Sequence, residues 1–448
     1  MPTDSIPCRQ GILIAFCLLQ GLAMVWALSW MMSDDVVTKK PVKSAPKHST
    51  YLCVGENYHT DSWKYKSCHF QDICYDGTNF SFYIDPQYPI SIPAVNELAV
   101  SVSTLGVTHS AIKFAPEVVV GSFPHDPVWA DEIDDTDLHV LAVEYNGSNF
   151  GHVLGDSLLP WWRLLDMFGL MEGDYPFRPI HMMIEPPFTY SCEWQIRAGW
   201  ISDMSFCGRL YEKIAQPFSH RALVFLQQHY SMATNEKPIC FQNLVTGIGM
   251  LSDHGHDHSV HGRNTEALDI HMVGGGPILW KFRSLYMQRI GLSSTVKPIP
   301  GLYDVVFVDR SSAHRSWFDT HEAYSRISER VAPIGAHVSS PIDFSKLTIK
   351  EQIEIVSRTQ VLICFPGGSS YIALFLPRGA TLIFVFALSH LSDGRQDYPL
   401  HNNMAHIHVR WLEGQKGENT GQVFYNVTHL EQEVELALVR ARRSTPPL

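Results

Sequence analysis

The chain has 448 residues, of which 45% are hydrophobic and 18% are charged, and its formal net charge is -11. This composition excludes a largely disordered chain, because the apolar residues suffice to build substantial interiors. The length exceeds the ~100 to 200 residues of one ordinary domain, so two domains are expected. Nucleic acid is not expected as a partner, because nucleic-acid binders cluster Lys and Arg against the phosphates and no such basic stripe is present.

The first element in chain order is an uncharged and almost continuously apolar segment from Gly11 to Met32. Its length is typical of a helix that spans a bilayer, so we predict a cytoplasmic tail over 1–10 and a signal-anchor transmembrane helix over 11–32. A cleaved signal peptide is the alternative, but its apolar region runs only about 7 to 15 residues. Basic residues are denser after this segment than before it, so charge alone does not place the C-terminus in a lumen.

Features after this segment favour a lumenal body and hence a single-pass type II protein of the Golgi or endoplasmic reticulum membrane. Three asparagines stand in glycosylation triplets, namely Asn79, Asn146 and Asn426. Six cysteines of the body could pair in an oxidising lumen, namely Cys53, Cys68, Cys74, Cys192, Cys207 and Cys240. A zinc site at Cys68 and Cys74 is the weaker alternative, because the close spacing of a metal knuckle is absent. Cys364 lies in an apolar run and is predicted to be buried outside any disulfide.

The remaining chain divides into a polar stem over 33–50, an N-terminal domain over 51–275 and a C-terminal domain over 276–448. Lysines and prolines dominate the stem, which suits an extended spacer. Near the domain boundary, the segment from Asp253 to His261 holds four histidines and two aspartates. We interpret it as a solvated loop, with a metal site as the alternative, because it has neither helical nor strand periodicity.

The C-terminal domain is predicted to alternate strands with helices, which indicates a parallel α/β unit. A capping box at Thr348 and Glu351 opens a helix that runs to about Arg358 and buries Ile349, Ile353 and Val356. In chain order the predicted elements are a strand over 305–308, a helix over 321–331, a strand over 334–338, the capped helix, a strand over 361–365, a short helix and a strand over 382–386.

Four segments carry residues suited to chemistry. In the first, Pro366, Gly367, Gly368, Ser369 and Ser370 follow a buried strand and open a helix. Glycines let the backbone approach a ligand, and helix-start amides and hydroxyls offer donors, so this turn suits a diphosphate. An ordinary glycine-rich turn between a strand and a helix is the alternative reading.

The second segment holds Asn149, His152 and Asp156. On a helix the four-residue spacing places His152 and Asp156 on one face, where the pair could present a base to an acceptor hydroxyl. Asn149 could cap this helix, and Pro160 is predicted to begin a new helical segment that ends at Gly169. A purely structural hydrogen bond between the two side chains is the alternative.

The third and fourth segments hold arginines and paired carboxylates. Arg310 and Arg315 directly follow the strand over 305–308, and ligands of open α/β sheets bind beyond the carboxyl ends of strands. Both arginines are therefore candidate diphosphate ligands, unless they belong to an ordinary surface loop. Asp135-Thr136-Asp137 has the spacing with which some transferases hold a divalent ion, but it closes an acidic run typical of a solvated loop.

These segments together resemble glycosyltransferase family 61. The match begins with Asn149, His152 and Asp156 in an Asn-x-x-His-x-x-x-Asp pattern, and it continues to about Phe386 through Asp343-Phe344, Leu347, Gln352, Val361, Gly367, Leu374-Phe375-Leu376-Pro377 and Gly379-Ala380. The resemblance implies a GT-B fold of two Rossmann-like domains that face a cleft, with the acceptor on the N-terminal side and the nucleotide sugar on the C-terminal side. It also implies an inverting reaction, a UDP-sugar donor, a glycan or glycoprotein acceptor and no obligatory metal or other cofactor.

The sequence departs from the family pattern at two places. The usual His-Gly-Ala is Pro366-Gly367-Gly368 here, and the usual Asn after the arginine motif is missing. We therefore keep a second hypothesis, a membrane-anchored pseudoenzyme that binds glycans or proteins without turnover. Under the first hypothesis His152 and Asp156 are catalytic, whereas Arg310, Arg315 and the turn from Gly367 to Ser370 bind the donor.

Overall fold

The computed structural model describes residues 48–55, 62–87, 92–102, 112–143, 149–171, 177–181, 196–197, 213–219, 221–247, 275–309, 320–365, 367–387, 399–402, 404–416 and 423–444. Several predicted features lie outside these residues: the tail over 1–10, the membrane span over 11–32, most of the stem, Asn146, Cys192, Cys207, the histidine-rich segment, Arg310, Arg315 and Pro366. Within the described part of the chain, no helix is both long and apolar enough to cross a bilayer.

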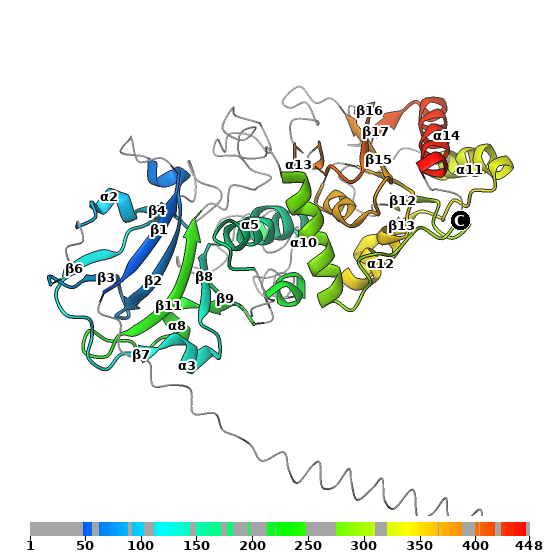
Figure 1. The fold of residues 1–448 in the computed structure, drawn as a ribbon. Helices are drawn as coiled ribbons and strands as arrows, with labels where there is room; N and C mark the ends of the chain where they lie inside the picture. Colours follow the sequence, from blue (N-terminus) through cyan, green and yellow to red (C-terminus); the bar gives the residue numbers. More distant parts are fainter. Residues whose placement is uncertain are drawn as a thin grey trace, which may run out of the picture. The chain divides into compact units, whose positions relative to one another are not determined.

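The N-terminal half of the described chain forms a nine-stranded mixed sheet, coloured blue to green in Figure 1. Its main path has the order β10-β9-β8-β11-β2-β3-β6, while β1 pairs with β2 and β7 with β11. The strands are β1 (Thr50–Val54), β2 (Ser67–Tyr75), β3 (Phe80–Ile84), β6 (Glu117–Val120), β7 (Val128–Trp129), β8 (Leu138–Ala142), β9 (Phe177–His181), β10 (Val224–Phe225) and β11 (Ile239–Gly247). A separate pair is formed by β4 (Val100–Ser101) and β5 (Lys113–Phe114).

The segment that carries Asn149 connects two parallel strands of this sheet. Strands β8 and β9 are parallel neighbours, and the chain between them forms a helical run that packs on the sheet. All five residues of β8 are buried, as expected for a parallel strand covered on both faces. The helices of this half are η1 (Ser62–Tyr65), α2 (Val95–Leu98), α3 (Ala130–Asp134), α4 (Phe150–His152), η2 (Val153–Leu158), α5 (Leu159–Met167) and α8 (Leu226–His229).

Two disulfides link neighbouring strands of the N-terminal sheet. Cys53 of β1 pairs with Cys68 of β2, and Cys74 of β2 pairs with Cys240 of β11. In both cases the two cysteines lie directly opposite each other in the strand register. The zinc alternative for Cys68 and Cys74 is thus wrong, because each sulfur is bonded to another cysteine. Cys364 is buried and belongs to neither disulfide, as predicted.

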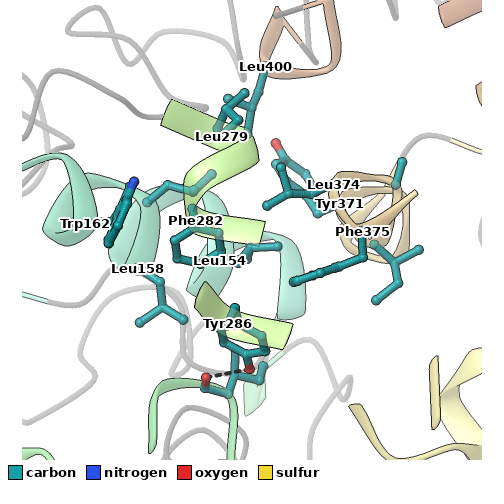
Figure 2. Close-up of a cluster of buried hydrophobic side chains, with 14 of the residues drawn as sticks. Leu154, Leu158, Trp162, Leu279, Phe282, Tyr286, Tyr371, Leu374, Phe375 and Leu400 are labelled. Carbon is teal, nitrogen blue, oxygen red and sulfur yellow. Dashed lines mark hydrogen bonds between the residues drawn. The ribbon is translucent and has the colours of Figure 1, made fainter. Parts of the chain in front are cut away.

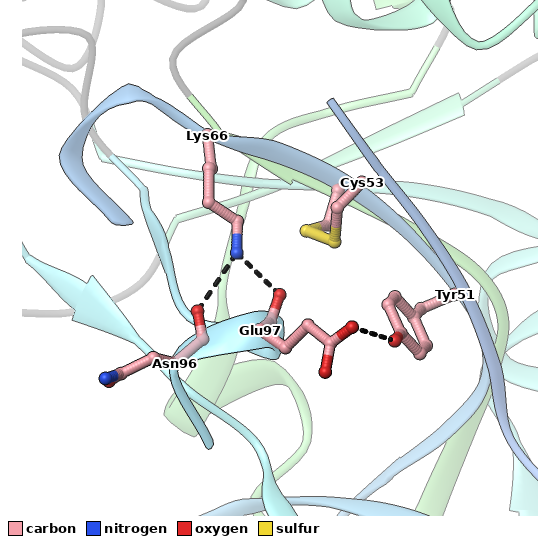
Figure 3. The surroundings of a disulfide bond; sticks show 6 residues. Tyr51, Cys53, Lys66, Asn96 and Glu97 are labelled. Atoms are coloured by element: carbon pink, nitrogen blue, oxygen red, sulfur yellow. Dashed lines mark hydrogen bonds between the residues drawn. A yellow bond between two sulfur atoms is a disulfide. The ribbon is translucent and has the colours of Figure 1, made fainter. Parts of the chain in front are cut away.

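A buried lysine lies beside the Cys53–Cys68 disulfide (Figure 3). The Nζ of Lys66 donates to the carbonyls of Asn96 and Glu97, at 3.0 and 2.6 Å, near the end of α2. Burial lowers the pKa of Lys66, and the nearby Glu97 opposes that shift. These two bonds satisfy helix-end carbonyls, so we assign Lys66 to the fold.

A buried ionic cluster lies at the amino end of β8 and centres on Asp134, at the end of α3. Its carboxylate accepts from His139 Nε2 at 2.9 Å, from His229 Nε2 at 2.6 Å and from the Tyr230 hydroxyl. Arg178 Nε lies 3.2 Å away. Burial raises the pKa of Asp134, but the hydrogen bonds from His139, Tyr230 and His229 and the charge of Arg178 outweigh it and bring the pKa to about 2.

The C-terminal half forms a six-stranded sheet in the order β13-β12-β14-β15-β16-β17, coloured yellow to red in Figure 1. All neighbours are parallel except β16 and β17. The strands are β12 (Val305–Asp309), β13 (Ile342–Asp343), β14 (Val361–Cys364), β15 (Thr381–Ala387), β16 (His408–Lys416) and β17 (Val423–Tyr425). The helices are α11 (Thr320–Val331), η3 (Ala332–Ile334), η4 (Phe344–Lys346), α12 (Ile349–Ser357), η5 (Gly368–Phe375), α13 (Pro399–Asn402) and α14 (Val427–Ser444).

This sheet confirms the predicted parallel α/β unit, with one element placed wrongly. The strand predicted over 334–338 is absent, and a short 3-10 helix ends at Ile334. Gly335 follows with φ 66°, a left-handed conformation that interrupts an extended run. Val338 makes a single isolated bridge to Val305, and the paired strand β13 begins only at Ile342.

The capping box of α12 is formed as predicted. Thr348 Oγ1 accepts from the Glu351 amide at 3.3 Å, and the Glu351 carboxylate accepts from the Thr348 amide at 2.8 Å. Ile353 and Val356 are fully buried below this cap. We expect Thr348→Ala to lower the free energy of unfolding by about 1 kcal/mol, the usual loss of an N-cap. Urea denaturation checks this, and a change below about 0.3 kcal/mol would contradict the role of the cap.

Helix α10 (Gly275–Arg289) packs against helices of both halves (Figure 2). Its Phe282 contacts the ring of Trp162 from α5, and its Tyr286 contacts the ring of Phe375 from η5. These side chains belong to one buried cluster that also includes residues of β8 and β14. The two sheets therefore share a continuous apolar core along α10.

Two of the predicted glycosylation sites lie within the described residues. Asn79 is exposed in the turn between β2 and β3. Asn426 is exposed just before α14, where its Oδ1 accepts from the amide of His429 at 3.1 Å. Both positions are open to a glycan, and its attachment stays a prediction.

Candidate active site at the contact of two motif turns

The Asn149 segment follows the carboxyl end of β8 and opens a helix. The Asn149 side chain accepts from the Gly151 amide at 2.9 Å, so it caps the helix start as predicted. The helical run then continues without interruption through α4, η2 and α5. The middle piece, η2, is a π-helix, a wide turn that is frequent at functional sites.

Pro160 lies in the first turn of the α-helix α5, close to the predicted start, but no break separates α5 from the preceding turn. The Leu159 amide bonds to the Leu154 carbonyl, so the π-turn leads directly into α5. Pro160 fits at this junction because it has no N–H that needs an acceptor in the first turn of α5. The run ends at Met167, two residues before Gly169, which takes the left-handed conformation common after helix ends.

His152 and Asp156 lie on one face of this run, as predicted. His152 Nδ1 and Asp156 Oδ2 are 2.8 Å apart. The Asp156 side chain is fully buried, whereas 14% of the His152 side chain is exposed. An Nδ1–H that donates to a carboxylate fixes the imidazole tautomer in which Nε2 is the basic nitrogen. The partly exposed imidazole is therefore the group of this pair that could take a proton from a substrate.

The glycine turn follows the carboxyl end of β14 and begins η5. Gly367 has φ 147°, a conformation open essentially to glycine alone. Gly368 and Ser369 are partly exposed at the start of η5, where the first amides of a helix lack partners within the helix. The backbone of this turn therefore has the donors expected of an anion-binding site.

The side chain of Ser370 bonds within the glycine turn. It is fully buried, and both its amide and its hydroxyl donate to the Gly367 carbonyl, at 2.9 and 2.8 Å. In this structure the hydroxyl closes the turn, and its predicted contact with the donor diphosphate stays a prediction.

The Asn149 turn and the glycine turn touch each other, although more than 200 residues separate them in the sequence. A Cβ added at Gly368 would overlap Asn149 Oδ1 and lie 2.9 Å from its Cγ. A Cβ added at Gly151 would lie 2.8 Å from the Gly368 Cα and 2.7 Å from Cδ2 of Tyr371. At both positions a side chain larger than that of glycine would clash with the other turn. The contact places the His152–Asp156 pair and the partly exposed start of η5 at one locus.

The glycine turn also lies at a point where the strand order of the C-terminal sheet reverses. From β12 the chain moves to β13 on one side and then to β14 on the other. Ligands of open α/β sheets bind beyond the carboxyl ends of strands at such a switch point. The loop that carries Arg310 and Arg315 starts at Asp309, the carboxyl end of β12, next to β14. Both arginines lie outside the described residues, so their role stays a prediction.

Sequence reasoning missed three residues that shape this site, namely Gly151, Tyr371 and His401. The Tyr371 ring fills the space beside Gly151, and His401 packs on it with ring centroids 5.1 Å apart. An isolated glycine within a predicted helix was the available signal for Gly151, because such a glycine often has a packing reason. No comparable signal exists for His401, which reaches η5 only through the tertiary fold.

The paired carboxylates of Asp135-Thr136-Asp137 lie elsewhere. They precede β8 at its amino end, whereas the Asn149 turn follows its carboxyl end. Asp135 is 83% exposed in its side chain and pairs with Arg221 at 3.1 Å. Among the described residues, no group of three or more His, Cys, Asp or Glu side chains is arranged to hold a metal ion. The geometry does not join these carboxylates to the candidate site.

The chain is similar in sequence to one protein family and resembles several solved structures. A family model described as glycosyltransferase 61 matches residues 150–383, a range that includes His152, Asp156 and the glycine turn. No curated protein matches the chain. One similar solved structure is a family 9 glycosyl transferase from Veillonella parvula, with 10% identity, a TM-score of 0.30 and coverage of 69% of this chain and 98% of that one. Another is the ADP-heptose lipopolysaccharide heptosyltransferase II of E. coli, with 8% identity, a TM-score of 0.30 and coverage of 68% and 99%.

The fold and the candidate site define an α/β protein with a glycine turn at a switch point of a parallel sheet. The family model covers more than half of the chain, and the chain belongs to the glycosyltransferase 61 family. Membership supports glycosyl transfer from a nucleotide sugar as the general activity.

Proposed function

We propose that this chain is an inverting glycosyltransferase that moves a sugar from a UDP-sugar to a hydroxyl of a glycan or glycoprotein. We further propose that its two sheets form a GT-B arrangement. The contact between the Asn149 turn and the glycine turn carries the proposal, because it brings a candidate base and a candidate anion cradle to one place.

The donor diphosphate would bind at the glycine turn. The amides of Gly368 and Ser369 would donate to its oxygens, and Arg310 and Arg315 would neutralise its charge. Negative charge grows on the diphosphate as the bond from the sugar C1 to the phosphate oxygen breaks, and preorganised donors stabilise that charge. These groups could replace a divalent ion, which fits the proposed independence from metal.

The acceptor hydroxyl would lose its proton to His152 while its oxygen attacks the sugar C1. Asp156 would hold the imidazole through Nδ1 and stabilise the imidazolium that forms, as a buried carboxylate does in other His-Asp pairs. Attack and departure on opposite faces of C1 invert the anomeric centre. Burial of Asp156 favours this division of roles over direct proton transfer to Asp156.

We also propose that the body is lumenal, anchored in the Golgi or endoplasmic reticulum membrane through residues 11–32. The two disulfides support an oxidising compartment. A non-catalytic binder with the same anchor is the second candidate, and the internal use of the Ser370 hydroxyl together with the Pro366-Gly367-Gly368 departure favours it.

A panel of nucleotide sugars tests the activity. We expect wild type to hydrolyse and transfer from a UDP-sugar, and His152→Ala to lower kcat about 10²- to 10⁴-fold through loss of the base. Arg315→Ala and Asp156→Asn are expected to lower it as well. His429→Ala is the control, because His429 faces Glu433 with the same four-residue spacing on the distant surface helix α14.

Two outcomes would overturn the assignment. Unchanged rates in all three site variants would remove these residues from the reaction. A wild-type protein that turns over no donor and whose melting temperature does not rise with UDP would favour the non-catalytic binder, because a native-state ligand stabilises by mass action.

A further inference from the structure

Helix η5 is held from outside by three side chains that donate to its carbonyls. It is a 3-10 helix of eight residues, although such helices rarely exceed three or four residues because their hydrogen bonds are poorly aligned. His401 Nε2 donates to the Ser370 carbonyl at 3.2 Å, His406 Nε2 to the Leu374 carbonyl at 3.2 Å, and Arg283 Nε to the Phe375 carbonyl at 3.1 Å.

The contacts of His406 and Arg283 have an ordinary structural reason, because both lie at the carboxyl end of the helix, where carbonyls lack helical partners. The Leu374 carbonyl would bond to the amide three residues later in a 3-10 helix, but that residue is Pro377, which has no N–H. The Phe375 carbonyl belongs to the last residue of the helix and also lacks a helical partner. His406 and Arg283 therefore satisfy carbonyls that would otherwise be buried and unpaired.

The contact of His401 differs, because Ser370 lies inside the helix. In a 3-10 helix its carbonyl would accept from the amide three residues later, that of Ala373, so capping alone gives no reason for a second donor. Ser370 is also the residue whose amide and hydroxyl close the glycine turn on the Gly367 carbonyl. The imidazole of His401 therefore bonds to the peptide group between Ser370 and Tyr371, which directly follows the amide that closes the turn.

His401 is placed to do this rigidly. It is fully buried on α13, and its ring packs against Tyr371 and Phe384 with centroid separations of 5.1 and 5.2 Å. Tyr371 in turn lies beside Gly151, the residue before His152. One buried imidazole thus contacts the glycine turn directly and the Asn149 turn through a single ring.

We propose that His401 is a positioning residue of the donor site, whose Nε2–H holds the Ser370 carbonyl and thereby sets the direction of the glycine-turn amides toward a diphosphate. This inference rests on the proposed function. It assigns to His401 no contact with the substrate. It predicts that loss of the His401 imidazole weakens binding of the nucleotide, whereas loss of the His406 imidazole does not.

The test compares His401→Phe with His406→Phe in the full chain. Phenylalanine keeps the aromatic packing and removes the N–H donor in both variants, and the two histidines bond to carbonyls of the same helix, at Ser370 and at Leu374. The Kd for UDP, ADP and GDP is measured with each protein, together with the donor KM and kcat. We expect His401→Phe to weaken binding of the preferred nucleotide about tenfold and to raise the donor KM, which corresponds to one lost hydrogen bond. For His406→Phe we expect a lower melting temperature with less than about threefold change in that Kd.

A third variant separates positioning from folding. His401→Gln keeps an N–H near the place of the imidazole Nε2, so it is expected to recover most of the nucleotide affinity. Equal Kd values for His401→Phe and wild type would overturn the inference, as would equal losses in the two phenylalanine variants. Wild-type protein that binds none of the three nucleotides would overturn the proposed function itself and the inference with it.

Discussion

Gly368→Ala is expected to slow sugar transfer strongly while the protein stays folded. The added methyl group would overlap Asn149 Oδ1 and lie 3.1 Å from the Gly151 amide, the donor that Asn149 caps. One turn must then move away from the other, and displacements of about 1 Å at a reacting centre can cost 10²-fold in rate. We therefore expect kcat/KM for the donor to fall at least about 10²-fold.

Gly121→Ala is the matched control for this variant. A Cβ at Gly121 would meet nothing within 4 Å, and its backbone needs no left-handed conformation. Its activity and melting temperature should equal those of wild type. Donor turnover by Gly368→Ala within twofold of wild type would show that the two turns need not touch for the reaction.

Asp134→Asn is expected to lower the free energy of unfolding by about 3 to 5 kcal/mol, the typical loss when one partner of a buried ion pair is removed. The change leaves Arg178 without its buried counter-charge and weakens the bonds from His139 and His229. Asp135→Asn is the control, because Asp135 is mostly exposed and its pair with Arg221 should contribute less than about 1 kcal/mol. Urea denaturation of both variants measures the difference, and equal midpoints would contradict a stabilising role of the cluster.

The same cluster determines how stability responds to acid. The pKa of Asp134 is about 2 in the folded protein and 3.8 in its unperturbed state, so the folded state favours the ionised form. This contribution is complete above about pH 4 and is lost as the pH falls toward 2. The stability difference between wild type and Asp134→Asn should therefore shrink over that range.

The C-terminal sheet could be predicted well because its signals are local. The strand over 305–308, the capped helix at Thr348 and the strand over 361–365 each carry a continuous apolar run or a capping pattern, and each is present. The strand over 334–338 failed because Pro333 and Gly335 favour a turn over an extended chain. The family resemblance, carried by the same segments, is confirmed.

The candidate site could be predicted only in part. The pairing of His152 with Asp156 follows from helical spacing, and the cap at Asn149 follows from its residue type. The use of the Ser370 hydroxyl within its own turn, and the contact of His401 with that turn, depend on the tertiary packing of η5. Sequence patterns hold no information on such contacts, because they join segments whose spacing in the chain is arbitrary.

The bond between Cys74 and Cys240 spans 166 positions of the sequence. His152 and Asp156 therefore lie within a covalent ring closed by this disulfide. A single cut of the backbone anywhere inside the ring leaves one covalent molecule, because the disulfide between β2 and β11 still joins the two fragments. Proteolysis in this region can nick the protein without releasing the residues proposed to take the acceptor's proton.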